Sequence, residues 1–199
     1  MIEKIDTKIN AIQALVLVPN RELAMQTSFV LKNLGKHKKI ESIICTGGTS
    51  VKEDFYRLGQ TVHVVVATPG RILDLASKEV AKLKNCKFLV LDEVDKLLSQ
   101  DFYSVVQMIM DLMNKPQIAL FSATYPQEIK AFQDKYVSDP KYVKPTDELT
   151  LKGITQYYAY LEENEKLHCL TTLFSKLEIS QAMIFCSSVK RVELLAQKI

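Results

Sequence analysis

Short apolar runs rich in β-branched residues alternate with helix-like segments along most of this chain. Runs without polar alternation, such as Val64-Val65-Val66, indicate strands that are buried on both faces, as in a parallel sheet covered by helices. Strands that are regularly followed by helices predict βαβ units and a doubly wound α/β domain. The predicted strands are Ala14–Val18, Ile40–Cys45, Val62–Ala67, Phe88–Leu91 and Ile118–Phe121.

A change of pattern near residue 145 predicts two domains. Turn-forming residues gather between Pro140 and Gly153. We therefore expect a first α/β domain over residues 1–145, a linker over 146–153 and the beginning of a second α/β domain over 154–199. The last region is predicted to hold strand Ile154–Tyr160, helix Glu163–Leu177, strand Ala182–Cys186 and helix Lys190–Lys198. Two βα units are too few to close a core, so we expect this second domain to be cut short.

Composition excludes several classes of protein. The hydrophobic fraction of 47% supplies a core, and the net charge of only +3 provides no basic stripe for nucleic acid. No apolar run reaches the roughly 18 residues of a membrane helix, and the charged start Met1–Asp6 is not a secretory signal. The four cysteines form no C-x-x-C pair, so we expect free thiols in a cytoplasmic or nuclear protein.

Three carboxylates follow the fourth predicted strand, at Asp92, Glu93 and Asp95. Carboxylates this close repel one another, and a divalent cation relieves the repulsion. Mg²⁺ prefers one or two carboxylates together with water and phosphate oxygens. Asp92 therefore predicts an Mg²⁺ site, and Glu93 a residue that orients or deprotonates an attacking water. The alternative is a solvated acidic turn that starts a helix over Val94–Leu98.

Ser122-Ala123-Thr124 follows the fifth predicted strand. The hydroxyls of Ser122 and Thr124 are suited to donate hydrogen bonds to Asp95 and so to link the acidic cluster to a second site. The alternative is an ordinary helix start before Pro126.

Three further loops at strand ends have the residues that a phosphate backbone requires. Unpaired amides at a helix start bind phosphate, and adjacent glycines let a ligand approach the backbone closely. Each loop alone is also explained as a helix start or a turn, but three together predict one extended groove. The loops are Pro19-Asn20-Arg21, Thr46-Gly47-Gly48-Thr49 and Thr68-Pro69-Gly70-Arg71.

These motifs together resemble the DEAD-box RNA helicase family. The segments that carry the resemblance are P-N-R-E-L-A at 19–24, G-G at 47–48, T-P-G-R at 68–71, D-E-V-D at 92–95, S-A-T at 122–124 and I-F-C-S-S at 184–188. They follow in the family's order and cover nearly the whole chain. Stretches 95–102, 148–160 and 191–196 resemble the cytoplasmic branch that activates decapping and represses translation.

The resemblance implies two RecA-like domains that close on ATP and single-stranded RNA. It implies that Asp92 holds Mg²⁺ through water, that Glu93 positions the hydrolytic water, and that Asp95 with Ser122 and Thr124 couples hydrolysis to RNA release. Recognition of the RNA backbone would be independent of sequence. The implied RNA contacts are Pro19, Asn20, Arg21, Gly47, Gly48, Thr68, Pro69, Gly70 and Arg71. The implied setting is cytoplasmic mRNA decay in ribonucleoprotein granules, with decapping and repression proteins as partners and no membrane.

The sequence departs from the family at the phosphate loop. None of the six glycines belongs to a G-x-x-x-x-G-K-S/T motif, and the four arginines leave no place for the family's later H-R-x-G-R-x-x-R motif, so the resemblance implies a chain truncated at both ends. Val94 also stands where the family has Ala, which adds bulk beside the predicted Mg²⁺ site, and Asn20 stands where it has Thr.

We expect a polypeptide of these 199 residues to show no RNA-stimulated ATP hydrolysis, because it lacks the loop that would bind the triphosphate of ATP. A phosphate-release assay checks this, and turnover above that of a Glu93→Gln chain contradicts it. An ATPase-inactive RNA- or protein-binding module is the alternative function. A different two-domain ATPase, such as a DNA-unwinding relative, is disfavoured by the motif order and by T-P-G-R.

Overall fold

The computed structural model describes residues 1–99, 102–143 and 153–199. The chain forms two compact units, Met1–Tyr142 and Val143–Ile199, and each is described by itself. Among the described residues, no helix combines the length and the apolar character needed to cross a membrane.

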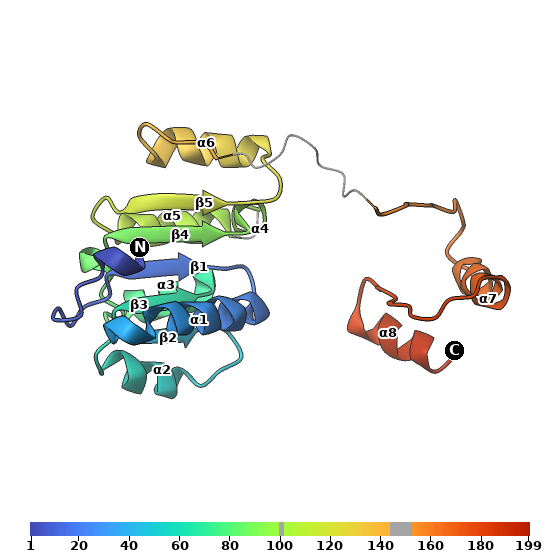
Figure 1. The fold of residues 1–199 in the computed structure, drawn as a ribbon, viewed down its shortest axis with the longest axis horizontal. Coiled ribbons are helices and arrows are strands. Elements are labelled where there is room, and N and C mark those ends of the chain that lie inside the picture. Colours follow the sequence, from blue (N-terminus) through green and yellow to red (C-terminus); the bar gives the residue numbers. More distant parts are fainter. Residues whose placement is uncertain (100–101, 144–152) are drawn as a thin grey trace. The chain divides into compact units, whose positions relative to one another are not determined.

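The first unit is built on a five-stranded parallel sheet, which confirms the predicted fold class (Figure 1). The spatial order is β2-β3-β1-β4-β5, so the chain builds one side of β1 and then crosses to the other. The strands are β1 Ala14–Leu17, β2 Ser42–Cys45, β3 Val64–Ala67, β4 Phe88–Asp92 and β5 Gln117–Phe121. Each lies within two residues of its predicted bounds, and β4 runs one residue further, to Asp92.

Helices cover both faces of this sheet, as the unbroken apolar runs predict. Figure 1 shows α1 in front of the sheet and α3 and α5 behind it. Leu15 and Leu17 of β1 belong to the larger core cluster, whereas Val16 and Val18 pack with Ala24 of α1. Alternate side chains of one apolar strand therefore enter two different cores. The helices are α1 Arg21–Gly35, α2 Val51–Leu58, α3 Pro69–Ser77, α4 Val94–Leu97, α5 Tyr103–Asp111 and α6 Gln127–Tyr136.

Strand register aligns the ends at which function was predicted. Leu17 of β1 is paired with Ala67 of β3 and Leu91 of β4, and Cys45 of β2 is also paired with Ala67. The carboxyl ends of neighbouring strands therefore meet at one edge of the sheet. In open α/β sheets this edge is where ligands bind.

Within the described residues 153–199, the second unit contains two helices, α7 Lys166–Lys176 and α8 Val189–Ala196, close to the two that were predicted. The two predicted strands, Ile154–Tyr160 and Ala182–Cys186, are wrong, because residues 153–199 contain no strand. An extended segment becomes a strand only by pairing with another, and none of these residues supplies a partner. Tyr157, in the first of these segments, is 90% exposed. Of the predicted linker 146–153, only Gly153 lies within the described residues.

All four cysteines are free, as expected, and two are fully enclosed. Burial raises the pKa of Cys45 to about 12, helped by the nearby Asp54 carboxylate. Burial likewise raises the pKa of Cys86 to about 12. Both thiols are therefore protonated at neutral pH and act as small apolar side chains in the core.

Candidate functional site

The three predicted phosphate-binding loops follow β1, β2 and β3, which are neighbours in the sheet. The structure brings them to one open groove of about 550 Å³. Seven of the nine predicted RNA-contacting residues line this groove, and Asp74 and Phe102, which were not predicted, line it too. The seven are Pro19, Asn20, Arg21, Gly47, Thr68, Gly70 and Arg71. We call this feature the loop groove.

The start of α3 offers backbone amides to the loop groove. Thr68 is the N-cap in an extended conformation, its side chain makes no capping bond, and Pro69 occupies the first turn. The first-turn amides of a helix have no partner within the helix, and here Gly70 supplies one of them. A Cβ built on Gly70 would meet no heavy atom within 4 Å, so the backbone is open to a ligand. Pro69 itself is buried and does not line the groove.

The glycine pair after β2 forms a closed turn. Gly48 has φ of 78°, a left-handed conformation that favours glycine. The Thr49 hydroxyl donates to the Thr46 carbonyl at 2.8 Å and closes the turn. A Cβ on Gly48 would lie 3.8 Å from Nη1 of Arg21, which places the first loop against the second.

Two of the predicted RNA-contacting side chains have partners within the protein. Asn20 caps α1, because its Oδ1 accepts from the Leu23 amide at 2.9 Å. The Arg71 guanidinium donates to the carboxylate of Asp54 and to the side chain and carbonyl of Thr49. No sequence pattern indicates these partners of Arg71, since Asp54 lies 17 residues away and resembles an ordinary acidic residue in the first turn of α2.

The acidic cluster begins where β4 ends. Asp92 is the last residue of β4, and its Oδ1 accepts from the Glu93 amide at 3.0 Å. Glu93 has φ of 51°, a left-handed conformation that is costly for a residue with a Cβ, and its carboxylate accepts from Lys96 at 2.8 Å. Val94 is fully buried in the main core, so it fills the core instead of adding bulk beside Asp92 as predicted.

The structure brings Asp95 together with both predicted hydroxyls. Ser122 donates to its Oδ1 at 2.8 Å and Thr124 to its Oδ2 at 3.0 Å, across 27 and 29 residues of sequence. Both oxygens of the carboxylate are thus held by the loop that follows β5. Because β4 and β5 are paired, the acidic cluster and the S-A-T loop lie at the same sheet edge as the loop groove.

We expect removal of these two hydroxyls to raise the pKa of Asp95. Burial raises this pKa, but the hydrogen bonds from the Ser122 and Thr124 hydroxyls and from the backbone amides of Asp95 and Lys96 together lower it by more, so the pKa lies below the ordinary 3.8. A lowered folded-state pKa stabilises the fold above pH 3.8, and this contribution is lost as the pH falls through the folded-state pKa. Titrating the Asp95 carboxyl by NMR in a Ser122→Ala/Thr124→Val chain checks this, with Ser104→Ala as the control. An unchanged titration would contradict the inference.

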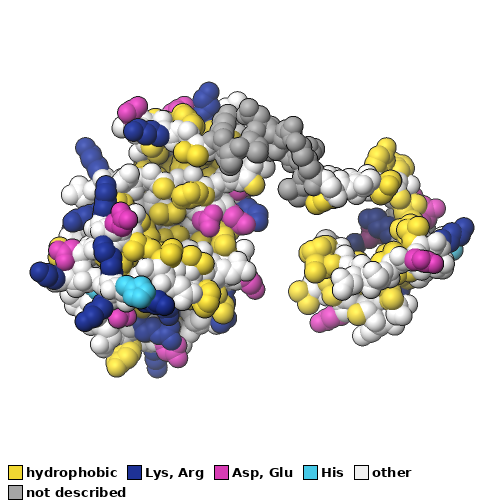
Figure 2. Space-filling model, viewed as in Figure 1, with side chains coloured by type: hydrophobic (Ala, Val, Ile, Leu, Met, Phe, Trp, Pro, Cys, Tyr) yellow, Lys and Arg dark blue, Asp and Glu magenta, His cyan; other side chains and the backbone are white. Residues whose placement is uncertain are grey.

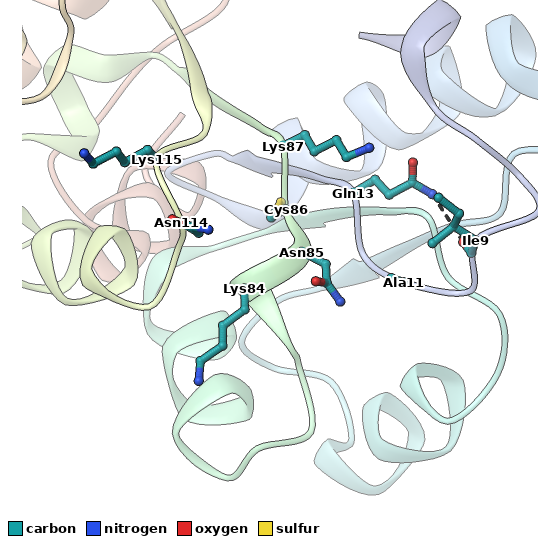
Figure 3. A pocket seen from close by; sticks show the side chains of 9 residues that line it. All are labelled: Ile9, Ala11, Gln13, Lys84, Asn85, Cys86, Lys87, Asn114 and Lys115. Carbon is teal, nitrogen blue, oxygen red and sulfur yellow. Dashed lines mark hydrogen bonds between the residues drawn. The ribbon is translucent and has the colours of Figure 1, made fainter.

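A second cavity, of about 450 Å³, lies at the opposite edge of the sheet, where residues that precede β1, β4 and β5 meet. It contains none of the predicted site residues. Figure 3 shows its three lysines, Lys84, Lys87 and Lys115, extending in different directions, so no convergent anion site exists there. Within the described residues, no group of three or more His, Cys, Asp and Glu side chains is arranged to hold a metal alone.

On the face that Figure 2 draws, basic side chains do not gather into a stripe. Figure 2 shows Lys and Arg scattered among acidic and apolar side chains on the face that it draws. The groups that the loop groove offers to a phosphate are backbone amides and single arginines.

Comparison with known proteins agrees with this geometry. A family profile described as "DEAD/DEAH box helicase" matches residues 1–132. The whole chain is 59% identical to "DEAD-box ATP-dependent RNA helicase 6" of Oryza sativa subsp. japonica, covering 40% of it, and 55% identical to "ATP-dependent RNA helicase DHH1" of Scheffersomyces stipitis, covering 39%. The structure of Dbp5 from S. cerevisiae bound to RNA and ADP BeF3 is similar over 98% of this chain and 50% of that one, with 29% identity and a TM-score of 0.83. The chain therefore spans about 40% of the length of the curated relatives it matches.

Proposed function

Since this chain belongs to the DEAD/DEAH box helicase family, we propose that it is the RNA-gripping and acidic part of an ATP-dependent RNA helicase. The observation that carries the proposal is the loop groove, where seven predicted RNA-contacting residues from three separate loops line one surface. The acidic cluster and the S-A-T loop stand at the same edge of the sheet. Such an arrangement suits an enzyme that couples phosphate chemistry to a bound strand.

We propose that the loop groove holds the sugar-phosphate backbone of single-stranded RNA. The open backbone at Gly47 and Gly70 and the amides at the start of α3 suit phosphate oxygens. Such contacts carry no base code, so binding is expected to be independent of sequence. The Dbp5 structure, which contains RNA, supports this proposal by its similarity.

The acidic cluster is proposed to serve ATP hydrolysis. Asp92 and Glu93 offer the oxygen donors that Mg²⁺ prefers, and their small number fits an ion that keeps water and phosphate ligands. Asp92 would hold the ion through water, and the ion, when bound, neutralises phosphate charge. Glu93 would position the attacking water and serve as the general base for it. Asp95, held by Ser122 and Thr124, would transmit the state of this site to the loop after β5.

We propose a second RecA-like domain for residues 154–199, joined through a linker at 146–153. The similarity to Dbp5, which extends over nearly the whole chain, supports this. We also propose a role in cytoplasmic mRNA decay and translational repression, in ribonucleoprotein granules with decapping and repression proteins. Its support is the resemblance of stretches 95–102, 148–160 and 191–196 to that branch, together with the identity to DHH1.

Substitution of Gly70 tests RNA binding directly. We expect Gly70→Val to lower the affinity for single-stranded RNA about tenfold or more, because the added side chain projects into open space where the strand would approach. Ser77→Val at the other, exposed end of α3 is the matched control. Fluorescence anisotropy with several unrelated RNA sequences provides the affinities. Equal affinity of the two variants, or strong preference for one sequence, would contradict the proposed groove.

The alternative is an ATPase-inactive RNA- or protein-binding module. It is favoured by one observation, that these 199 residues contain no G-x-x-x-x-G-K-S/T motif. The upstream coding sequence separates the two functions. An in-frame phosphate-loop motif there supports the helicase, whereas an upstream stop codon with a folded, RNA-binding product supports the module.

A further inference from the structure

We propose that Arg71 is a positioning residue, which clamps the Gly47-Gly48 turn to the start of α3 through Asp54 and Thr49. This inference rests on the proposed function, because the two backbone segments that the clamp joins are those proposed to hold RNA. Resemblance to the family placed Arg71 among the RNA contacts, but its position in the structure favours a role within the protein.

The guanidinium of Arg71 uses both of its terminal nitrogens on the protein. Nη1 donates to Oδ2 of Asp54 at 2.5 Å and to Oγ1 of Thr49 at 3.2 Å. Nη2 donates to the carbonyl oxygen of Thr49 at 2.9 Å. Because the guanidinium is planar and rigid, these bonds fix the Thr49 backbone relative to α3 in a way that a single charge would not.

Burial distinguishes this ion pair from the other ion pairs among the described residues. The side chains of Arg71 and Asp54 are 10% and 2% exposed, whereas those of Arg57 and Glu53, one turn apart on α2, are 51% and 63% exposed. A phosphate would have to displace an enclosed carboxylate to reach Arg71 fully. The positive charge of Arg71 is already compensated by Asp54 within the fold.

The clamp joins elements that border the loop groove. The Thr49 hydroxyl accepts a hydrogen bond from Arg71 and donates one to the Thr46 carbonyl. Gly47 and Gly48 therefore lie between two residues, Thr46 and Thr49, that these hydrogen bonds hold in place. Thr68, which caps α3, donates its amide to the Cys45 carbonyl at 3.1 Å on the other side. The distance between the Gly48 turn and the Gly70 amide is thereby held constant, as two-point binding of one strand requires.

The test measures loop order and RNA binding in an Arg71→Lys chain. Lysine keeps the positive charge but lacks the planar guanidinium group, which donates from two nitrogens at once. We expect amide hydrogen exchange at residues 47–49 to rise at least tenfold, with exchange of the β1 and β3 amides unchanged. Affinity for single-stranded RNA should fall at least tenfold, with its dependence on salt unchanged. Arg57→Lys, in the exposed pair on α2, is the matched control and should change neither quantity.

Two results would overturn the proposal. One is unchanged loop exchange together with a weaker RNA complex whose salt slope falls by about 0.7 in an Arg71→Met chain, as loss of one phosphate contact predicts. The other is exchange that rises equally throughout the sheet, in Arg71→Lys and also in Asp54→Leu/Arg71→Met, where no buried charge remains unpaired. If the unsubstituted chain binds no RNA, the proposed function fails, and the exchange measurement still decides whether the clamp exists.

Discussion

The Phe132→Ala chain is expected to lose about 3–5 kcal/mol of its free energy of unfolding, the cost of deleting a fully enclosed aromatic side chain. Phe132 is completely buried on α6, where it belongs to the main core cluster. Its ring lies 4.7 Å from that of Tyr136, centroid to centroid. A domain of this size is stable by only about 5–15 kcal/mol, so the loss is a large fraction of the total.

Urea denaturation followed by far-UV circular dichroism measures this loss. Phe29→Ala is the matched control, because Phe29 also lies on a helix but is 68% exposed. We expect the control to change the free energy of unfolding by about 0.5 kcal/mol or less. Equal losses in the two variants would show that α6 does not pack on the core as described.

The Asp54→Leu chain is expected to lose about 3–5 kcal/mol of its free energy of unfolding, because the substitution leaves the Arg71 charge enclosed without its partner. Adding Arg71→Met should recover most of that loss, since replacing both partners of a buried pair by apolar residues is close to neutral. The recovery distinguishes an uncompensated charge from a simple packing defect.

Glu53→Leu supplies the control for this pair of variants. Glu53 lies beside Asp54 on α2 and pairs with Arg57, but both side chains of that pair are more than half exposed. Exposed pairs contribute about 0–1 kcal/mol, so this change should be small. A double variant as unstable as Asp54→Leu alone would show that hydrogen bonds to Thr49, more than the charge, hold this region together.

The sheet was predictable because its signal is local. Strands such as Val64–Ala67 are apolar at every position, and only burial on both faces makes that favourable. β2 and β3 each begin two residues later than predicted, at Ser42 and Val64, which are paired with each other. The second unit shows the opposite case. Residues 154–160 have a strand-like composition, but pairing is not local, and no partner lies within residues 153–199.

It was also predictable that the candidate site residues lie together at one edge of the sheet, but the contacts of each side chain were not predictable. Parallel strands place all their carboxyl ends at one edge, so Thr68 and Ser122 had to follow strands that end together. Periodicity did not reveal that Phe102 lines the loop groove, or that Val94 turns into the core. Both depend on how α4 and α5 pack against the sheet.

Sequence by itself determined the succession of strands and helices in the first unit, the loops that carry phosphate-binding chemistry and the candidate partners of Asp95, Ser122 and Thr124, because each follows from local composition and from the geometry of parallel sheets. Only the tertiary structure decided that Arg71 is enclosed by Asp54 and Thr49 while Gly70 is open. A guanidinium on a helix start can reach outward to a ligand or inward to a carboxylate. Which way it points depends on the position of α2, and the residues around Arg71 in the sequence do not specify that position.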